Sequence, residues 1–179
     1  MNPAPNLALV GPMGAGKSSI GKRLAARLDL AFVDMDQLLE QMAGVAIPVI
    51  FEMEGEVGFR RRETQLIGEL LEASGQVIST GGGAVLADAT RTRLQERSFV
   101  VYLQVSIDQQ LERLARDQSR PLLTQGERRA TLQALAEQRN PLYEQIADLM
   151  FVADGPNANL SCQHLLEQVR VQWQFAPAA

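Results

Sequence analysis

Residues 11–18 read GPMGAGKS and match the phosphate-binding pattern G-x-x-x-x-G-K-[ST]. The match directly follows an apolar run, Asn6–Val10, and directly precedes a segment of helical period, Lys17–Leu28. In this context glycines allow a tight backbone turn, and the first helical turn presents its N–H groups to an anion. The sequence therefore predicts a loop that cradles a chain of phosphates between a strand and a helix.

Each part of this phosphate-binding loop has an expected task. Lys17 would reach the β- and γ-phosphates, and the Ser18 hydroxyl is placed to hold Mg²⁺. The sequence contains no guanine-reading N-K-x-D, since Lys17 and Lys22 are its two lysines, so ATP is favoured over GTP. The residues expected to bind the nucleotide in this segment are Gly14, Ala15, Gly16, Lys17, Ser18 and Ser19.

Length and composition favour one ordinary folded domain over residues 1–179. The chain is 46% apolar and 21% charged, and a domain takes roughly 100–200 residues. A net charge of −4 argues against nucleic acid or an anionic membrane as the main partner. The single cysteine, the absence of a signal peptide and the absence of an apolar run of about 18 residues predict a cytoplasmic protein. We expect a monomer with small-molecule substrates.

Short apolar runs alternate with longer segments of helical period, which is typical of an α/β fold with a parallel sheet between helices. Five strands are predicted at Asn6–Val10, Ala31–Asp34, Gln76–Thr80, Phe99–Val105 and Leu149–Val152. Helices are predicted at Lys17–Leu28, Met35–Met42, Glu56–Glu72, Asp88–Gln95, Ile107–Arg116, Arg128–Ile146 and Asn159–Gln174.

Three stretches do not follow this alternation. Ala43–Gly55 and Asp117–Glu127 are predicted to be loops, and loops of this kind often carry function. The C-terminal FAPAA is predicted to be a loose end.

Two carboxylates stand at the end of the second predicted strand. Residues two apart in an extended chain point to the same side, so Asp34 and Asp36 would face one place and could hold a metal or a hydroxylated ligand. The alternative is that Asp36 caps the helix that starts at Gln37. The pair alone does not decide between these interpretations.

Two further segments have a functional and an ordinary interpretation. Arg60 and Glu63 share a helix face, so the glutamate could orient the guanidinium as a clamp for a carboxylate or phosphate. A solvated basic face is the alternative. The run Gly81–Gly83 follows the third predicted strand and would let a ligand lie against the backbone, although a tight turn would also need glycines.

Six segments in this order resemble the shikimate kinase family: GPMGAGKS, FVDMD, GFRRRE, STGGGA, SRPLL at Ser119–Leu123 and QRNPLY at Gln138–Tyr143. The resemblance covers most of the chain. It implies a P-loop kinase with a fold like the nucleoside monophosphate kinases and a five-stranded parallel sheet. It also implies transfer of the γ-phosphoryl group of MgATP to the 3-hydroxyl of shikimate, in the chorismate route to aromatic amino acids. Residues 43–72 would form a helical substrate-binding region and residues 117–127 a short lid, and Ala43–Gly55 falls where the family places its shikimate-binding helices.

The resemblance also implies roles for individual residues. Asp34 would lie near Mg²⁺ together with Ser18, and Asp36 would contact the shikimate hydroxyls. The remaining implied roles are a carboxylate clamp from Arg60 and Arg139, a ring-lining surface from Gly81, Gly82 and Gly83, a lid contact to the phosphates from Arg120, and adenine stacking by Arg113. The catalytic set would be Lys17, Asp36 and Arg120.

Two rival functions stay open at this stage. A kinase for another small hydroxy acid, such as gluconate, would also need a phosphate-binding loop and an arginine clamp. A non-catalytic ATP-binding regulatory protein would bind nucleotide without turnover.

Overall fold

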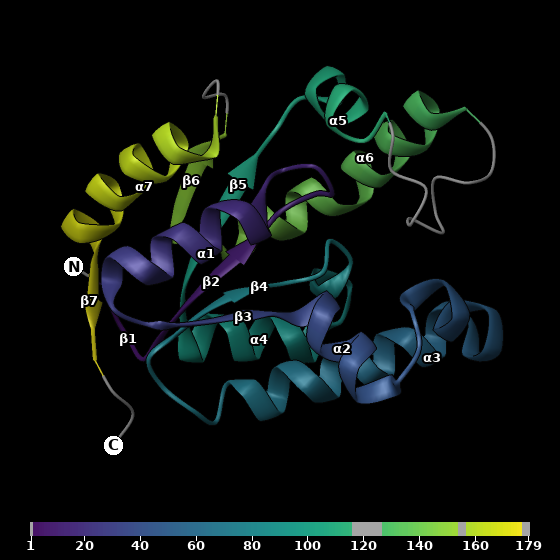
Figure 1. Ribbon diagram of the computed structural model, residues 1–179, viewed down its shortest axis with the longest axis horizontal. Helices are drawn as coiled ribbons and strands as arrows, with labels where there is room; N and C mark the ends of the chain where they lie inside the picture. Colours follow the sequence, from purple (N-terminus) through teal and green to yellow (C-terminus); the bar gives the residue numbers. More distant parts are fainter. Residues whose placement is uncertain (1, 116–126, 154–156, 177–179) are drawn as a thin grey trace.

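The computed structural model describes residues 2–115, 127–153 and 157–176, built around a five-stranded parallel sheet (Figure 1). The strand order is β3-β4-β2-β5-β6. The strands are β2 (Asn6–Val10), β3 (Ala31–Asp34), β4 (Gln76–Ser79), β5 (Ser98–Gln104) and β6 (Leu149–Val152). The predicted α/β class and the parallel sheet are confirmed, because each predicted strand is present to within a residue at either end.

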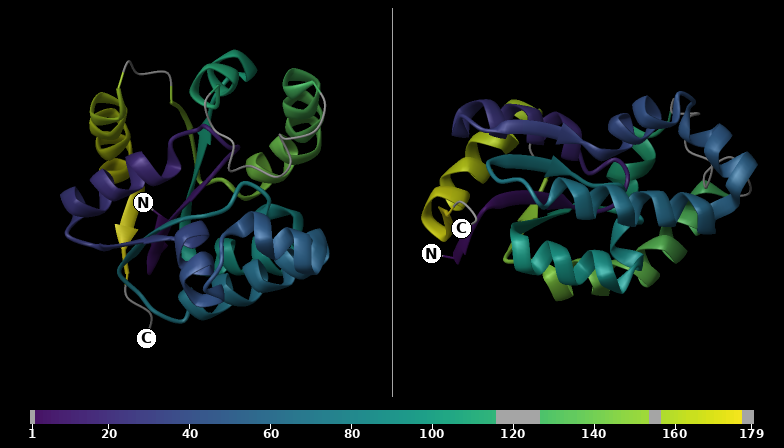
Figure 2. Two further views of the ribbon diagram at one scale, coloured as in Figure 1. Left: turned by 45° about the vertical axis from the view of Figure 1, so that its right-hand side comes forward. Right: turned by 90° about the horizontal axis from the view of Figure 1, so that it is seen from below.

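Helices cover both faces of this sheet (Figure 2). Helices α1 (Lys17–Leu28) and α7 (Ala158–Gln172) pack together on one face. The opposite face is covered by α4 (Asp88–Arg97) and α6 (Arg128–Ile146), with α3 (Ile47–Leu70) packed against α4. Three shorter helices, α2 (Met35–Ala43), η1 (Ala84–Leu86) and α5 (Ile107–Arg113), follow the carboxyl ends of strands.

Alternating side chains of the strands fill two separate cores. In β2, Leu7 and Leu9 belong to the core under α1 and α7, whereas Ala8 and Val10 belong to the core on the opposite face. Both faces of the strand are therefore buried, which explains why its sequence is a continuous apolar run without polar alternation.

The segment Ala43–Gly55, which the residue pattern predicted as a loop, is largely helical, in agreement with the helices that the resemblance implied. Helix α3 begins at Ile47, with Pro48 in its first turn, where the missing N–H is not needed. Gly55 interrupts the helix with φ 67° and ψ −177°, a conformation that side-chain-bearing residues rarely adopt. Val49 and Met53 are exposed, so the segment lacked the amphipathic pattern that would have predicted a helix.

The two ends of the described chain pair with each other, which the sequence did not predict. Strand β1 (Asn2–Ala4) runs parallel to β7 (Trp173–Phe175), and the Trp173 indole N–H donates to the Ala4 carbonyl at 3.1 Å. The predicted helix to Gln174 therefore ends at Gln172, and Phe175 is part of a strand and not a loose end.

Most of the predicted lid lies outside the described residues, and so does Arg120. Within the described ranges, no helix combines the length and the apolar character needed to cross a membrane.

Candidate functional site

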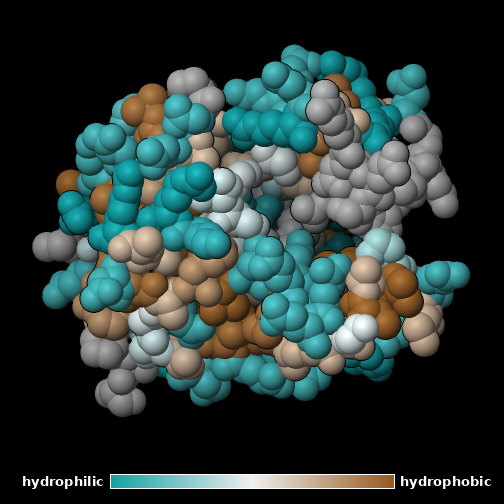
Figure 3. Space-filling model, in the orientation of Figure 1, coloured by the Kyte–Doolittle hydropathy of each residue, from teal (hydrophilic) through white to brown (hydrophobic). Residues whose placement is uncertain are grey.

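The candidate site lies at the carboxyl edge of the sheet, where ligands bind in open α/β folds. The loops after β2, β3 and β4 meet there, and Figure 3 shows a hollow between this edge and the helices around it. One lobe of the hollow, the acceptor pocket, is lined by Met13, Asp36, Ile47, Phe51, Phe59, Arg60, Glu63, Gly81, Gly82, Gly83 and Arg139.

The phosphate-binding loop has the predicted form. It ends at Gly16, whose φ of 87° is left-handed, and α1 begins at the next residue. The buried Lys17 ammonium donates to the carbonyl oxygens of Gly11 at 2.7 Å and Pro12 at 2.9 Å. The N-terminal N–H groups of α1 and this ammonium make one electropositive concavity.

The residues proposed for Mg²⁺ lie on adjacent elements. The Ser18 hydroxyl is 3.4 Å from that of Ser79, and Asp34 stands opposite Ser79 in the β3–β4 register. Within the described ranges, no three His, Cys, Asp or Glu side chains form a group that could enclose a metal. Two oxygen donors beside a phosphate-binding loop fit Mg²⁺, which binds few protein groups and completes its shell with phosphates and water.

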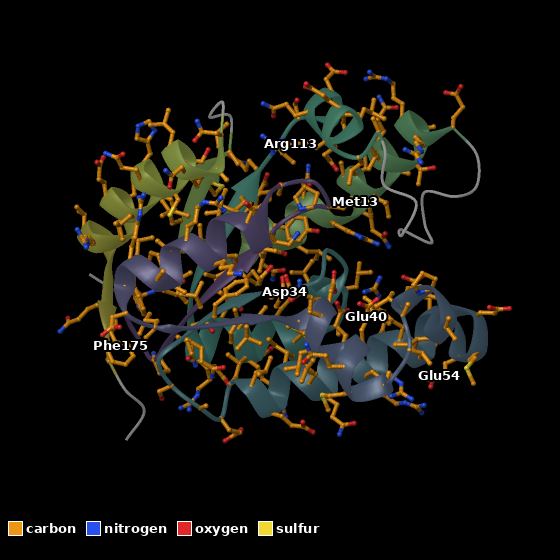
Figure 4. All side chains as sticks on the ribbon, viewed as in Figure 1. Met13, Asp34, Glu40, Glu54, Arg113 and Phe175 are labelled. Carbon is orange, nitrogen blue, oxygen red and sulfur yellow. The ribbon has the colours of Figure 1, made fainter. Side chains whose placement is uncertain are left out.

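The structure corrects the reasoning about the two aspartates. The chain becomes helical at Met35, so Asp34 and Asp36 are not two positions of one strand. Asp34 is the residue that caps α2, accepting from the Gln37 N–H at 3.2 Å, whereas the capping alternative had named Asp36. Asp36 lies in the first turn of α2 and lines the acceptor pocket, and Figure 4 shows Asp34 where β3 meets α2.

Arg60 and Glu63 form a largely buried ion pair. Arg60 Nη1 donates to Glu63 Oε2 at 2.7 Å, and Nη2 donates to the exposed Glu56 at 3.2 Å. Burial raises the pKa of Glu63 despite the nearby guanidinium. Burial lowers the pKa of Arg60, but the Glu63 carboxylate and Glu56 reverse this, so the Arg60 pKa is raised. Glu63 thus holds a cation at the pocket wall, in the predicted orienting arrangement.

Arg139 reaches the same pocket from α6. The residue is 4% exposed, and its Nε has no hydrogen-bond partner within the described part of the chain. Burial lowers the pKa of Arg139, and the positive charge of Arg60 also acts against its protonation. Two guanidinium groups in one pocket make it a receptor for an anion.

Close approach explains two of the three glycines in the Gly81–Gly83 run. A Cβ at Gly83 would overlap the Arg60 guanidinium, and a Cβ at Gly81 would overlap the Glu63 carboxylate. The alternative, a tight turn after the strand, is also present, because the Ala84 N–H donates to the Gly81 carbonyl at 3.2 Å. None of the three glycines has a positive φ, so the backbone of the turn does not itself require glycine.

A second pocket lies on the other side of the phosphate-binding loop, lined by Ala15, Gly16, Ile20, Arg113, Ala153, Asn157, Ala158 and Ser161. Arg113 donates to the carbonyls of Gly14 at 2.9 Å and Ala153 at 2.8 Å, and Figure 4 shows it extending from α5. The pocket fits the predicted nucleotide side of the site. Ser19, by contrast, lies on the exposed side of α1 and accepts from Arg23.

Sequence reasoning missed the apolar wall of the acceptor pocket. The rings of Phe51 and Phe59 lie 4.6 Å apart and line the pocket beside Arg60. Phe59 directly precedes Arg60 in the GFRRRE segment, and this adjacency could have predicted that Phe59 lines the pocket.

A family comparison agrees with this geometry. The family model described as "Shikimate kinase" matches residues 13–170, which is most of the chain. The chain belongs to the shikimate kinase family. The resemblance predicted from the six segments is therefore confirmed.

Individual relatives in the shikimate kinase family are similar over nearly the whole chain. A protein of Stenotrophomonas maltophilia named shikimate kinase is 52% identical over 174 residues, covering 97% of each chain. The solved shikimate kinase from Acinetobacter baumannii in complex with shikimate is 41% identical, with a TM-score of 0.91 and 94% of each chain covered.

A solved gluconokinase from Sinorhizobium meliloti has a TM-score of 0.55, covers 96% of this chain and 99% of its own, and is 18% identical. That likeness shows that the two proteins share a fold.

Proposed function

We propose that this protein transfers the γ-phosphoryl group of ATP to the 3-hydroxyl of shikimate. The observation that carries the proposal is an acceptor pocket with the buried Arg139, the half-buried Arg60 and Asp36, directly beside a complete phosphate-binding loop. Shikimate has one carboxylate and a set of ring hydroxyls, so it matches such a pocket in charge and in hydrogen-bonding groups. The family membership and the shikimate-bound relative support the same acceptor.

Two positively charged side chains and one carboxylate would hold the acceptor. Arg60 and Arg139 bind its carboxylate, and Asp36 accepts a hydrogen bond from a ring hydroxyl. The Gly82–Gly83 backbone would contact the ring. Fixing the acceptor at several points orients one hydroxyl toward the phosphates, and such positioning supplies much of the rate in phosphoryl transfer.

The transfer step is a single displacement. The 3-hydroxyl oxygen forms a bond to the γ-phosphorus, the bond from that phosphorus to the bridging oxygen breaks, and ADP leaves. Asp36 takes the proton of the attacking hydroxyl. Lys17 and Arg120 offset the charge that develops on the transferred group, and Arg113 would contact the adenine from the second pocket. When bound by Ser18 and Asp34, Mg²⁺ supplies further charge neutralisation at the phosphates.

The test is ADP release from MgATP by the purified protein, with shikimate, with gluconate and without acceptor. We expect release that depends on shikimate and a product with one phosphate ester at the 3-hydroxyl, checked by NMR. Release with gluconate alone would contradict the acceptor assignment. ATP binding without release would make the protein a nucleotide-binding regulator.

A further inference from the structure

Tyr143 lies behind the acceptor pocket. It is fully buried and follows Arg139 by four residues on α6, so the two side chains share a helix face. Its ring packs against that of Tyr102 from β5, with the ring centres 5.0 Å apart. The helix that supplies an arginine to the acceptor pocket thus also supplies a buried phenol.

The Tyr143 hydroxyl donates a hydrogen bond to the carbonyl oxygen of Gly82. Burial raises the pKa of Tyr143, so the hydroxyl keeps its proton and stays a donor at neutral pH. The phenol also interacts with the Arg139 side chain, and together with the ring packing and the backbone acceptor this leaves it little freedom to reorient.

Gly82 lies between the phosphate-binding loop and the acceptor pocket. A Cβ built on it would lie 3.6 Å from the Gly11 oxygen, 3.6 Å from the Met13 nitrogen and 3.8 Å from Arg139 Nη1. Gly82 is therefore next to both the phosphate-binding loop and an arginine of the acceptor pocket. A small rotation of its peptide group would change the acceptor pocket at that junction.

The planarity of the peptide group links the hydrogen bond of Tyr143 to the orientation of the Gly83 N–H. The Gly82 carbonyl and the Gly83 N–H belong to one planar trans group, and in such a group they point in opposite directions. The hydrogen bond to Tyr143 therefore sets the direction of the Gly83 N–H. Gly83 in turn borders the Arg60 guanidinium.

We propose that Tyr143 is a positioning residue for the acceptor, which fixes the Gly82–Gly83 peptide group so that the backbone surface of the pocket is formed before the acceptor binds. The inference rests on the function proposed above and adds a residue that touches neither substrate. Its loss weakens acceptor binding and leaves nucleotide binding intact, since the second pocket has no contact with this hydroxyl.

The test compares Tyr143→Phe with Tyr102→Phe. Each variant removes one hydroxyl from the same buried ring pair, but only the Tyr143 hydroxyl bonds to the pocket backbone. For Tyr143→Phe we expect the KM for shikimate to rise about five- to tenfold, the size expected for one lost hydrogen bond. The KM for ATP and kcat should stay within about twofold, and Tyr102→Phe should leave all three within about twofold.

The readout separates positioning from damage to the fold. Partial unfolding lowers the active fraction and hence kcat, but it does not change the KM of the molecules that remain folded. An unchanged KM for shikimate in Tyr143→Phe, an equal rise in the KM for ATP, or the same effect in Tyr102→Phe would each overturn the positioning role. Wild-type protein without shikimate-dependent ADP release would overturn the proposed function itself, and this is observed before any variant is made.

Discussion

Replacing Gly83 by alanine should displace Arg60 from the acceptor pocket. Gly83 has φ −98° and ψ −1°, so its backbone accepts alanine without strain. The new Cβ would overlap the Arg60 guanidinium, which must then move away. That movement breaks the 2.7 Å hydrogen bond to Glu63 and removes one of the two guanidinium groups proposed to bind the acceptor carboxylate.

The size of the effect follows from the charged contact that is lost. A hydrogen bond to a charged group contributes about 1.5–3 kcal/mol, which corresponds to about a 10- to 150-fold rise in the KM for shikimate. The nucleotide side of the site is untouched, so the KM for ATP should stay within about twofold.

The decisive assay is a double-mutant cycle with Arg60→Ala, read as shikimate-dependent ADP release. If Gly83→Ala acts by displacing the guanidinium, it has almost no effect once that guanidinium is absent. Gly82→Ala is the matched control, because its new Cβ lies at ordinary contact distances from the phosphate-binding loop and does not meet Arg60. In the double variant, the fold-change in the KM for shikimate caused by Gly82→Ala should multiply with the fold-change caused by Arg60→Ala. If the Gly83→Ala effect also multiplies with that of Arg60→Ala, the displacement argument is wrong.

Two further predictions concern stability. Asn6 is fully buried at the opposite edge of the sheet, where it donates to the Ala73 carbonyl at 2.8 Å and accepts from the Gln76 N–H at 3.1 Å. Asn6→Ala leaves both backbone groups without this partner and should lower the free energy of unfolding by about 2–4 kcal/mol, measured by urea denaturation. A loss below about 1 kcal/mol would show that these two hydrogen bonds do not stabilise the fold as argued. Glu63 has a raised pKa when folded, so the native state holds its proton more tightly than the unfolded state, and the resulting stability is present below the unfolded pKa and lost as pH rises through the folded one. Glu63→Gln lacks this loss, so its free energy of unfolding relative to wild type should rise as the pH increases above the unfolded pKa of a glutamate. A difference that stays constant across a pH series of urea denaturation experiments would refute the assignment.

The strands were predictable because each is a short apolar run buried on both faces. The bounds of β2, β3 and β6 agree with the prediction at both ends. The phosphate-binding loop was predictable because its chemistry depends on neighbours in sequence: a turn of glycines, a lysine and a helix start. The Arg60–Glu63 pair was predictable for the same reason, since a spacing of three places both side chains on one helix face.

Local patterns failed where a conformation depends on distant parts of the chain. The helix after Ala46 has little apolar periodicity, and the short strands β1 and β7 pair residues about 170 positions apart. The change to helix at Met35 gave Asp34 and Asp36 different surroundings that strand alternation could not foresee.

By itself, the sequence determined which chemical groups this protein has and which short segments carry them, because propensity, burial pattern and spacing act over a few residues. Only the tertiary structure decided which of these groups meet. The strand order β3-β4-β2-β5-β6 brings the loops after β2 and β4 together, so that Gly82 lies against Gly11 and near Arg139. The hydrogen bond from Tyr143 to Gly82 joins residues 61 positions apart, and it exists because the packing of α6 on the sheet places that hydroxyl beside that carbonyl.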